Sequence, residues 1–285
     1  MQHPAWFTDF VSKKRLDHFI DIDQGRIHYQ SWGESNKPGL LFVHGHAAHS
    51  HWWDFIAPAF LHQYHVAAMD MSGYGDSDHR NQYSAAGFAN EILGVAKQLG
   101  EHTTVVGHSF GGAMTRVTAY LHGDELAAIV LVDSVISAVK GTRKTPVLPK
   151  QKSHFYPSVE AGMRRFRLRP PQSCDNRYLL DYIARHSLKE TDHGFEFKLD
   201  QSVFSRMIED PAVDLPDAAT MIRTIGCPVA FVYGGQSRFF PPQNRGLIES
   251  LFNSDRLLRI EDAHHHIFLD EPLEFIRVLT QLLQN

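Results

Sequence analysis

Cysteine is scarce in this sequence of 285 residues, which contains only Cys174 and Cys227. Two cysteines cannot form a disulfide framework or a four-thiolate zinc site. Long hydrophobic runs are also absent, since no stretch approaches the roughly 18 apolar residues of a membrane-spanning helix. Residues 1–18 lack the apolar segment of a signal peptide. We therefore expect a cytoplasmic protein without a membrane span.

The sequence has no excess of basic residues either. Lys and Arg number 28 against 32 Asp and Glu, which gives a formal net charge of −4. Nucleic-acid-binding domains usually carry a strongly basic face, so we expect no nucleic-acid partner; the small-molecule substrate that we expect follows from the motifs described below. Hydrophobic residues make up 43% and charged residues 21%, which excludes a disordered or collagen-like chain. The composition leaves the oligomeric state open.

Short apolar runs alternate with helical patterns over most of the chain. In residues 84–99 the apolar positions Phe88, Ile92, Val95 and Leu99 fall on one helix face. Continuous apolar strands separated by helices predict a parallel sheet that is buried on both faces. The first two strands are joined by so short a turn that they must be antiparallel. The expected strands are 18–23, 26–32, 39–43, 66–70, 103–107, 127–133, 228–233 and 256–260.

This alternation stops in the middle of the chain. Residues 136–215 are richer in arginine, proline and aromatic residues, and the alternation resumes after them. The sequence therefore predicts one α/β core formed by residues 1–135 and 216–285, interrupted by an insertion at 136–215.

The most informative motif is Gly-His-Ser-Phe-Gly at residues 107–111, between an apolar strand and a helical pattern. A tight strand-to-helix turn lifts the serine hydroxyl out of the chain and requires small residues beside it. The N-terminus of the following helix favours negative charge. We therefore predict that Ser109 is a nucleophile.

This motif and three others resemble the α/β-hydrolase family, in its serine-nucleophile branch of esterases, lipases and C–C bond hydrolases. The other motifs are the turn His44-Gly45-His46, the pattern Asp70-x-x-Gly73-x-Gly75-x-Ser77, and the histidine loop 263–272. The resemblance implies a mostly parallel central sheet with helices on both faces, and a cap inserted after the sixth strand. In this family, haloalkane dehalogenases and most epoxide hydrolases have an aspartate at the position that resembles Ser109. A serine hydroxyl at this position instead suits attack on an acyl carbon.

A serine hydroxyl needs a base to take its proton. Three histidines, His264, His265 and His266, occupy the loop where the family places this base. In the family an acid follows the histidine by five residues and a proline by seven. Asp270 and Pro272 satisfy this spacing for His265, and His264 remains the alternative.

The third member of the triad departs from the common pattern. Many members of the family carry an aspartate after the seventh strand, but the matching position here is Ser237, and no aspartate lies between Ala218 and Ser254. Asp133 ends the sixth strand, where some members of the family carry their acid. We predict that Asp133 orients His265. The alternatives are a strand-capping role for Asp133 and a Ser-His dyad.

The expected oxyanion donors are the backbone N–H groups of Phe110 and His46. Five aromatic residues are candidates for the substrate pocket, although ordinary core packing would also explain them: Trp52, Trp53, Phe155, Phe166 and Phe204. Four arginines of the insertion could meet an anionic substrate or form a solvated basic face: Arg164, Arg165, Arg167 and Arg169.

The chain contains 19 histidines, some of them clustered at residues 44–51 and 264–266. No helical histidine pair with an acidic partner completes a zinc-protease motif, so we predict neither a metal nor a cofactor. The expected function is hydrolysis of a carboxylic ester of a small or medium acyl group through an acyl-enzyme. The alternatives are a C–C bond hydrolase of diketones, a cofactor-free dioxygenase of the same fold, and a ligand-binding receptor without catalysis.

Overall fold

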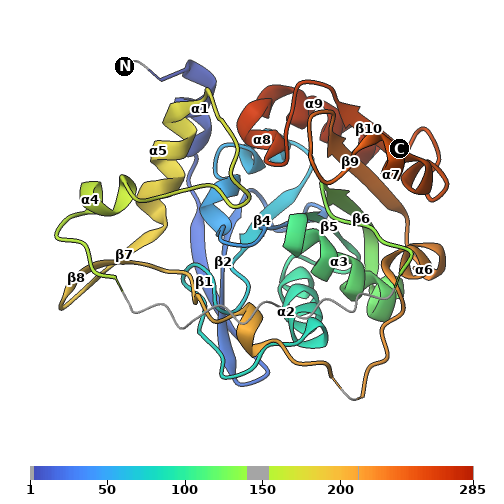
Figure 1. The fold of residues 1–285 in the computed structure, drawn as a ribbon, viewed down its shortest axis with the longest axis horizontal. Helices are drawn as coiled ribbons and strands as arrows, with labels where there is room; N and C mark the ends of the chain where they lie inside the picture. The colour runs from blue at the N-terminus through green and yellow to red at the C-terminus, as the bar shows by residue number, and fades with distance from the viewer. Residues whose placement is uncertain (1–2, 140–153, 211, 285) are drawn as a thin grey trace.

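A computed structural model describes residues 3–139, 154–210 and 212–284 and contains a central sheet of eight strands (Figure 1). The strand order is β1-β2-β4-β3-β5-β6-β9-β10. The strands are β1 (Leu16–Ile22), β2 (Gly25–Trp32), β3 (Gly39–Val43), β4 (His65–Met69), β5 (Thr103–His108), β6 (Leu126–Val132), β9 (Val229–Gly234) and β10 (Leu257–Ile260). Strand β2 pairs antiparallel with β1 and β4, and the other neighbours are parallel. The predicted mostly parallel α/β sheet and its antiparallel first pair are confirmed.

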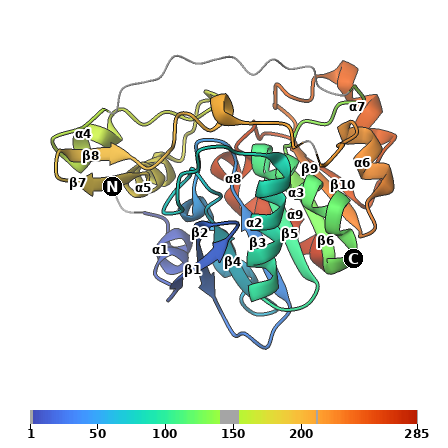
Figure 2. The ribbon, with the colours of Figure 1, turned by 90° about the horizontal axis from the view of Figure 1, so that it is seen from below.

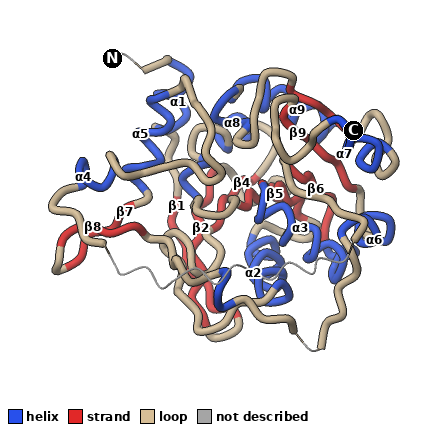
Figure 3. The backbone as a smooth tube through the Cα atoms, viewed as in Figure 1, coloured by secondary structure: helices blue, strands red, loops and turns tan. Residues whose placement is uncertain are grey.

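Helices cover both faces of this sheet because its inner strands are apolar on both sides. In β3, Phe42 faces one hydrophobic core and Leu41 faces the other. The first core includes α1 (Ala5–Val11), η1 (Ser50–Trp53), η2 (Ala57–Phe60), α5 (Arg177–His186), α8 (Ile267–Asp270) and α9 (Pro272–Gln284). The second includes α2 (Ala85–Gln98), α3 (Ser109–His122), α6 (Ala218–Thr224) and α7 (Pro242–Glu249). Figures 2 and 3 show this layered arrangement.

The described part of residues 136–215 contains α4 (Val159–Met163), α5, a separate hairpin of β7 (Leu188–Thr191) and β8 (Gly194–Phe197), and the 3-10 helix η4 (Phe204–Arg206). Another 3-10 helix, η3 (Gly123–Glu125), precedes β6. Figures 1 and 2 both place α4, α5 and the hairpin at the end of the molecule opposite α6 and α7. Residues 140–153 and 211 of the predicted insertion lie outside the described residues.

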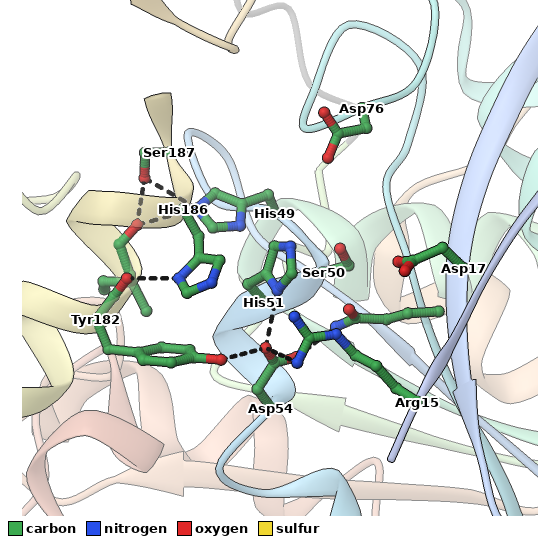
Figure 4. A network of polar contacts seen from close by, with 12 residues as sticks. Arg15, Asp17, His49, Ser50, His51, Asp54, Asp76, Tyr182, His186 and Ser187 are labelled. Carbon is green, nitrogen blue, oxygen red and sulfur yellow. Dashed lines mark hydrogen bonds and ion pairs between the residues drawn. The ribbon is translucent and has the colours of Figure 1, made fainter. Parts of the chain in front are cut away.

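A buried carboxylate joins α5 to the core. Asp54 follows η1 and is 1% exposed. Its Oδ2 atom accepts hydrogen bonds from Tyr182 Oη at 2.6 Å and His51 Nδ1 at 2.8 Å, and lies 3.4 Å from Arg15 Nη1 (Figure 4). Gln30 donates to the other carboxylate oxygen. Burial alone would raise the pKa of Asp54, but the contacts with His51 and the other donors hold it below its usual value. The buried carboxylate of Asp54 therefore contacts side chains from four segments of the chain.

Across residues 3–139, 154–210 and 212–284, no helix combines the length and apolar character that crossing a membrane requires.

Candidate active site

Ser109 lies at the junction of β5 and α3, which follow each other without an intervening loop. Its φ angle is +53°, in the left-handed region that residues other than glycine seldom adopt. The turn is tightly packed, since a side chain at Gly111 would collide with the carbonyl oxygen of His44. The strained turn holds the hydroxyl at the N-terminus of α3, where the first N–H groups have no partner within the helix.

His265 lies in the loop between β10 and α8 and is 4% exposed. Its Nε2 atom is 2.9 Å from Ser109 Oγ, and its Nδ1 atom is 2.6 Å from Asp133 Oδ1. The neighbouring His264 instead contacts Asp270, through its backbone N–H at 2.7 Å and its ring Nδ1 at 3.2 Å. His265 is therefore the member of this histidine run that the structure brings to Ser109.

Asp133 follows β6 directly and is completely buried. Its Oδ2 accepts the N–H of Gly234 at 2.9 Å, and its Oδ1 accepts the hydroxyl of Ser237 at 2.7 Å as well as the ring N–H of His265. The sequence analysis identified Ser237 only as the position where an acid is missing. Its hydrogen bond to Asp133 connects residues 104 positions apart, and no local pattern in the sequence signals such a contact.

Burial affects the two ionisable groups in opposite directions. Loss of hydration raises the pKa of Asp133, an effect that the hydrogen bonds from Gly234 and Ser237 counter. Loss of hydration lowers the pKa of His265, which favours the neutral imidazole at pH 7. With the proton on Nδ1, where Asp133 accepts it, the lone pair on Nε2 faces the hydroxyl of Ser109.

The turn at residues 44–47 lies directly against the turn that carries Ser109. A Cβ atom at Gly45 would lie 2.8 Å from His108 Nδ1 and 3.1 Å from Ser109 Cβ. The ring of His44 holds the turn from the other side, because its Nε2 accepts the N–H of Met71 at 3.1 Å. This close approach places the backbone of the predicted oxyanion donor His46 beside the start of α3, where the other predicted donor, Phe110, lies.

The candidate pocket residues differ in position. Phe204 packs against His46, with 4.3 Å between ring centroids, and against Phe110 at 5.3 Å. Phe166 lines a cavity beside the oxyanion turn. Trp53, in contrast, is completely buried in the first hydrophobic core, where it packs on Phe42 and Phe268. Trp53 therefore packs as a core residue, the role that the sequence left open beside the pocket assignment.

Two further pocket candidates have other ring contacts. Phe155 is 40% exposed and packs on His193 at the β7–β8 turn. Trp52 is 2% exposed and packs against His266, in the loop that carries His265, with 5.4 Å between ring centroids. Aromatic content alone did not distinguish these core and surface positions from a pocket wall.

The histidine clusters have separate partners. His44 contacts Gly45 and Met71, His46 contacts Tyr74, His49 contacts Ser187, and His51 contacts Asp54. Ring nitrogens of His108, His265 and His266 lie within 4.8 Å of one another. However, both ring nitrogens of His265 already contact Asp133 and Ser109, and Nε2 of His108 contacts the carbonyl of His265. This group would have to give up its contact with Ser109 or Asp133 to hold a metal ion.

Comparisons with known proteins agree with the fold. A family model described as alpha/beta hydrolase fold matches residues 38–272. The mouse sn-1-specific diacylglycerol lipase ABHD11 is 24% identical over 278 residues, covering 88% of this chain and 82% of its own. A pimeloyl-[acyl-carrier protein] methyl ester esterase of Aeromonas hydrophila is 25% identical over 248 residues, covering 85% and 94%. The crystal structure of E-2-(acetamidomethylene)succinate hydrolase superposes with a TM-score of 0.78 at 19% identity, covering 95% and 100%.

Proposed function

Because the chain belongs to the α/β-hydrolase fold family, we propose that it is a serine hydrolase that cleaves a carboxylic ester of a small or medium acyl group. The observation that carries this proposal is the continuous line of contacts from Ser109 Oγ through His265 to the buried carboxylate of Asp133. The same order of nucleophile, base and acid activates serine in unrelated hydrolases.

In the proposed reaction His265 Nε2 takes the hydroxyl proton while Ser109 Oγ attacks the ester carbonyl carbon. Asp133 holds the imidazole in the tautomer that can accept this proton and stabilises the imidazolium that forms. The N–H groups of Phe110 and His46 stabilise the negative charge that develops on the carbonyl oxygen, and such donors typically contribute about 10²–10³ in rate each.

The tetrahedral intermediate then collapses, and His265 gives its proton to the departing alcohol. An acyl group remains on Ser109. Water attacks this acyl-enzyme with His265 again acting as base, which releases the acid and restores the hydroxyl. These steps use only groups of the chain, the ester and water.

We propose residues 136–215 as a cap that covers this site. The contact of Phe204 with both oxyanion-donor residues supports a position for that ring at the wall of an acyl pocket. The contact between Tyr182 and Asp54 supports a fixed position for α5 relative to the core.

An activity screen tests the proposal. The purified chain is offered esters, lactones and vinylogous diketones, with oxygen uptake recorded in parallel, and the Ser109→Ala variant is the matched control. We expect turnover of esters that the variant loses while its unfolding temperature stays unchanged. Cleavage of diketones alone, oxygen uptake, or ester turnover that persists in the variant would each contradict the proposal.

A further inference from the structure

A cavity of about 110 Å³ lies beside the turn at residues 44–47. The side facing the core consists of Ala47 and Ala48, which directly follow the proposed oxyanion donor His46. The other sides come from the insertion and from the turn at Gly75: Arg165, Phe166, Arg167, Arg169, Ser187, Phe197, Lys198, Leu199 and Gln201. A water molecule occupies about 30 Å³ in the liquid, so the cavity has room for a small chemical group.

The lining of this cavity is strongly cationic in an otherwise acidic protein. It includes Arg165, Arg167, Arg169 and Lys198 but neither aspartate nor glutamate. Lys198 forms an ion pair with Asp76 at 2.6 Å. Arg167 donates to the backbone carbonyls of residues 164 and 166, and Arg169 lies 3.4 Å from the amide oxygen of Gln201. None of these arginine contacts neutralises a charge.

Three carboxylates of the insertion have cationic partners other than these arginines. The pairs are Glu160 with Arg185, Glu196 with Lys189, and Asp200 with Arg206. Within the part of the chain that the structure describes, no ion pair joins a carboxylate to Arg165, Arg167 or Arg169. Three positive charges therefore face the cavity without a negative counterpart from the chain.

The positive charge extends to the candidate active site. His46 loses hydration on burial and experiences the charge of Arg169, and together these lower the pKa of His46 to about 4. Arg169 thus lies within electrostatic range of the oxyanion turn. A molecule bound in the cavity therefore lies against Ala47, the residue that follows the proposed oxyanion donor His46.

A buried contact fixes the side of the cavity formed by α5. Ser187 Oγ donates to the carbonyl of Ile183 at 2.7 Å, so His49 Nε2–H is the donor in the 2.9 Å contact between His49 and Ser187 (Figure 4). Both His49 and Ser187 line the cavity. The arrangement joins the oxyanion turn to the C-terminal end of α5 and keeps the cavity open beside the turn.

We propose that this cavity binds a carboxylate or phosphate group at the end of the substrate remote from the scissile ester. The inference rests on the proposed function and specifies its substrate class as a short ester that carries a negative charge. The planar guanidinium group suits both anions because it offers paired N–H donors. The rings of Phe166 and Phe197 and the side chain of Leu199 cover the methylene chain between the ester and the anion.

The experiment compares monomethyl esters of the C4 to C8 dicarboxylic acids with methyl esters of monocarboxylic acids of equal chain length. An ω-phosphorylated methyl ester of the preferred length distinguishes phosphate from carboxylate. The quantity measured is the ratio of kcat/KM for the anionic ester to kcat/KM for the neutral ester. We expect a ratio of about 10 or more at low ionic strength, since charge-assisted hydrogen bonds are stronger than neutral ones, and a smaller ratio at high salt.

The decisive variant is Arg165→Gln/Arg169→Gln, in which we expect the ratio to fall toward one. Arg169→Lys should retain part of the preference because the charge remains. Arg169→Gln alone should also lower the ratio, and its matched control is Arg164→Gln, which removes one charge from the same segment. Arg164 lines a separate cavity between α4 and α5, not the cavity at the turn, so the control should keep the wild-type ratio.

A wild-type ratio near one, or an equal fall in the control, would overturn the anionic subsite while leaving ester hydrolysis in place. Hydrolysis of neither class would instead overturn the proposed function. In that case the anionic subsite is tested by binding alone. Calorimetry compares the binding of adipate and of hexanoate to the Ser109→Ala variant. Preferential binding of adipate that the double arginine variant loses would support it, and equal binding would refute it.

Discussion

Replacing Asp133 by asparagine is expected to reduce ester turnover by about 10⁴, the loss that the same exchange causes in a serine protease. In the wild type, Oδ1 of Asp133 accepts both the ring N–H of His265 and the hydroxyl of Ser237. An asparagine can present its NH₂ group to His265, which moves the ring proton to Nε2. That nitrogen then cannot accept the proton of Ser109. The loss corresponds to about 5.5 kcal/mol of transition-state stabilisation.

A carboxylate at position 237 should restore part of this activity. Ser237 Oγ lies 2.7 Å from the same carboxylate oxygen that His265 Nδ1 contacts at 2.6 Å. An aspartate side chain at 237 therefore begins beside the vacated acceptor. We expect Asp133→Asn/Ser237→Asp to recover at least about tenfold in turnover.

The assay is hydrolysis of a short p-nitrophenyl ester under saturating conditions. Asp133→Asn/Ser237→Asn is the matched control, since it has the same shape without the charge and should recover nothing. Unfolding temperatures of all variants show whether the fold is retained. Near wild-type turnover in Asp133→Asn would refute the role of the carboxylate and leave Ser109 and His265 as a dyad.

Further predictions concern the base, the oxyanion turn and the anchoring of α5. His265→Ala should reduce kcat as much as loss of the nucleophile does, because members of a triad act as a unit. His264→Ala should have a smaller effect. The reverse order in steady-state kinetics would identify His264 as the base. The base must be unprotonated and Asp133 must be a carboxylate to accept its Nδ1 proton, so kcat/KM should fall with decreasing pH as the buried His265–Asp133 pair takes up a proton. A rate that stays constant as the pH falls would contradict this. Gly45→Ala should reduce activity strongly because its Cβ would lie 2.8 Å from a ring nitrogen of His108, and unchanged kcat would show that the turn can move away. Tyr182→Phe removes the hydroxyl bound to Asp54 and should lower the free energy of unfolding in urea by about 1–3 kcal/mol; an unchanged value would show that the remaining donors suffice.

The parts of the fold that follow from repeated local patterns could be predicted from the sequence. The strands of the core are continuous apolar runs, and their range and order in the chain agree with the structure to within about two residues at most ends. Helix α1 was not predicted, because seven residues show too few turns for a periodic pattern. Its buried residue Phe7 packs against Tyr178 of α5, so tertiary contacts stabilise it.

The candidate site also has parts that could be predicted from the sequence and parts that could not. Ser109 has a local signature in the glycine-flanked turn. Asp133 was predicted from the resemblance, because the family's usual position holds Ser237 and some members of the family carry their acid after the sixth strand. The contact of Ser237 with Asp133 could not be predicted, since it depends on the parallel pairing of β6 with β9. The packing of Trp53 could not be predicted either, because its sequence neighbours do not reveal that its ring contacts Phe42 and Phe268.

Covalent labelling with a fluorophosphonate, followed by mass spectrometry of the peptides, tests the central claim most directly. The reagent reacts with a serine hydroxyl only when a neighbouring base has activated it. The account predicts one adduct, on Ser109, that forms in step with the loss of ester hydrolysis and is greatly reduced in His265→Ala. An adduct on another serine, or full inactivation while Ser109 stays unmodified, would contradict it.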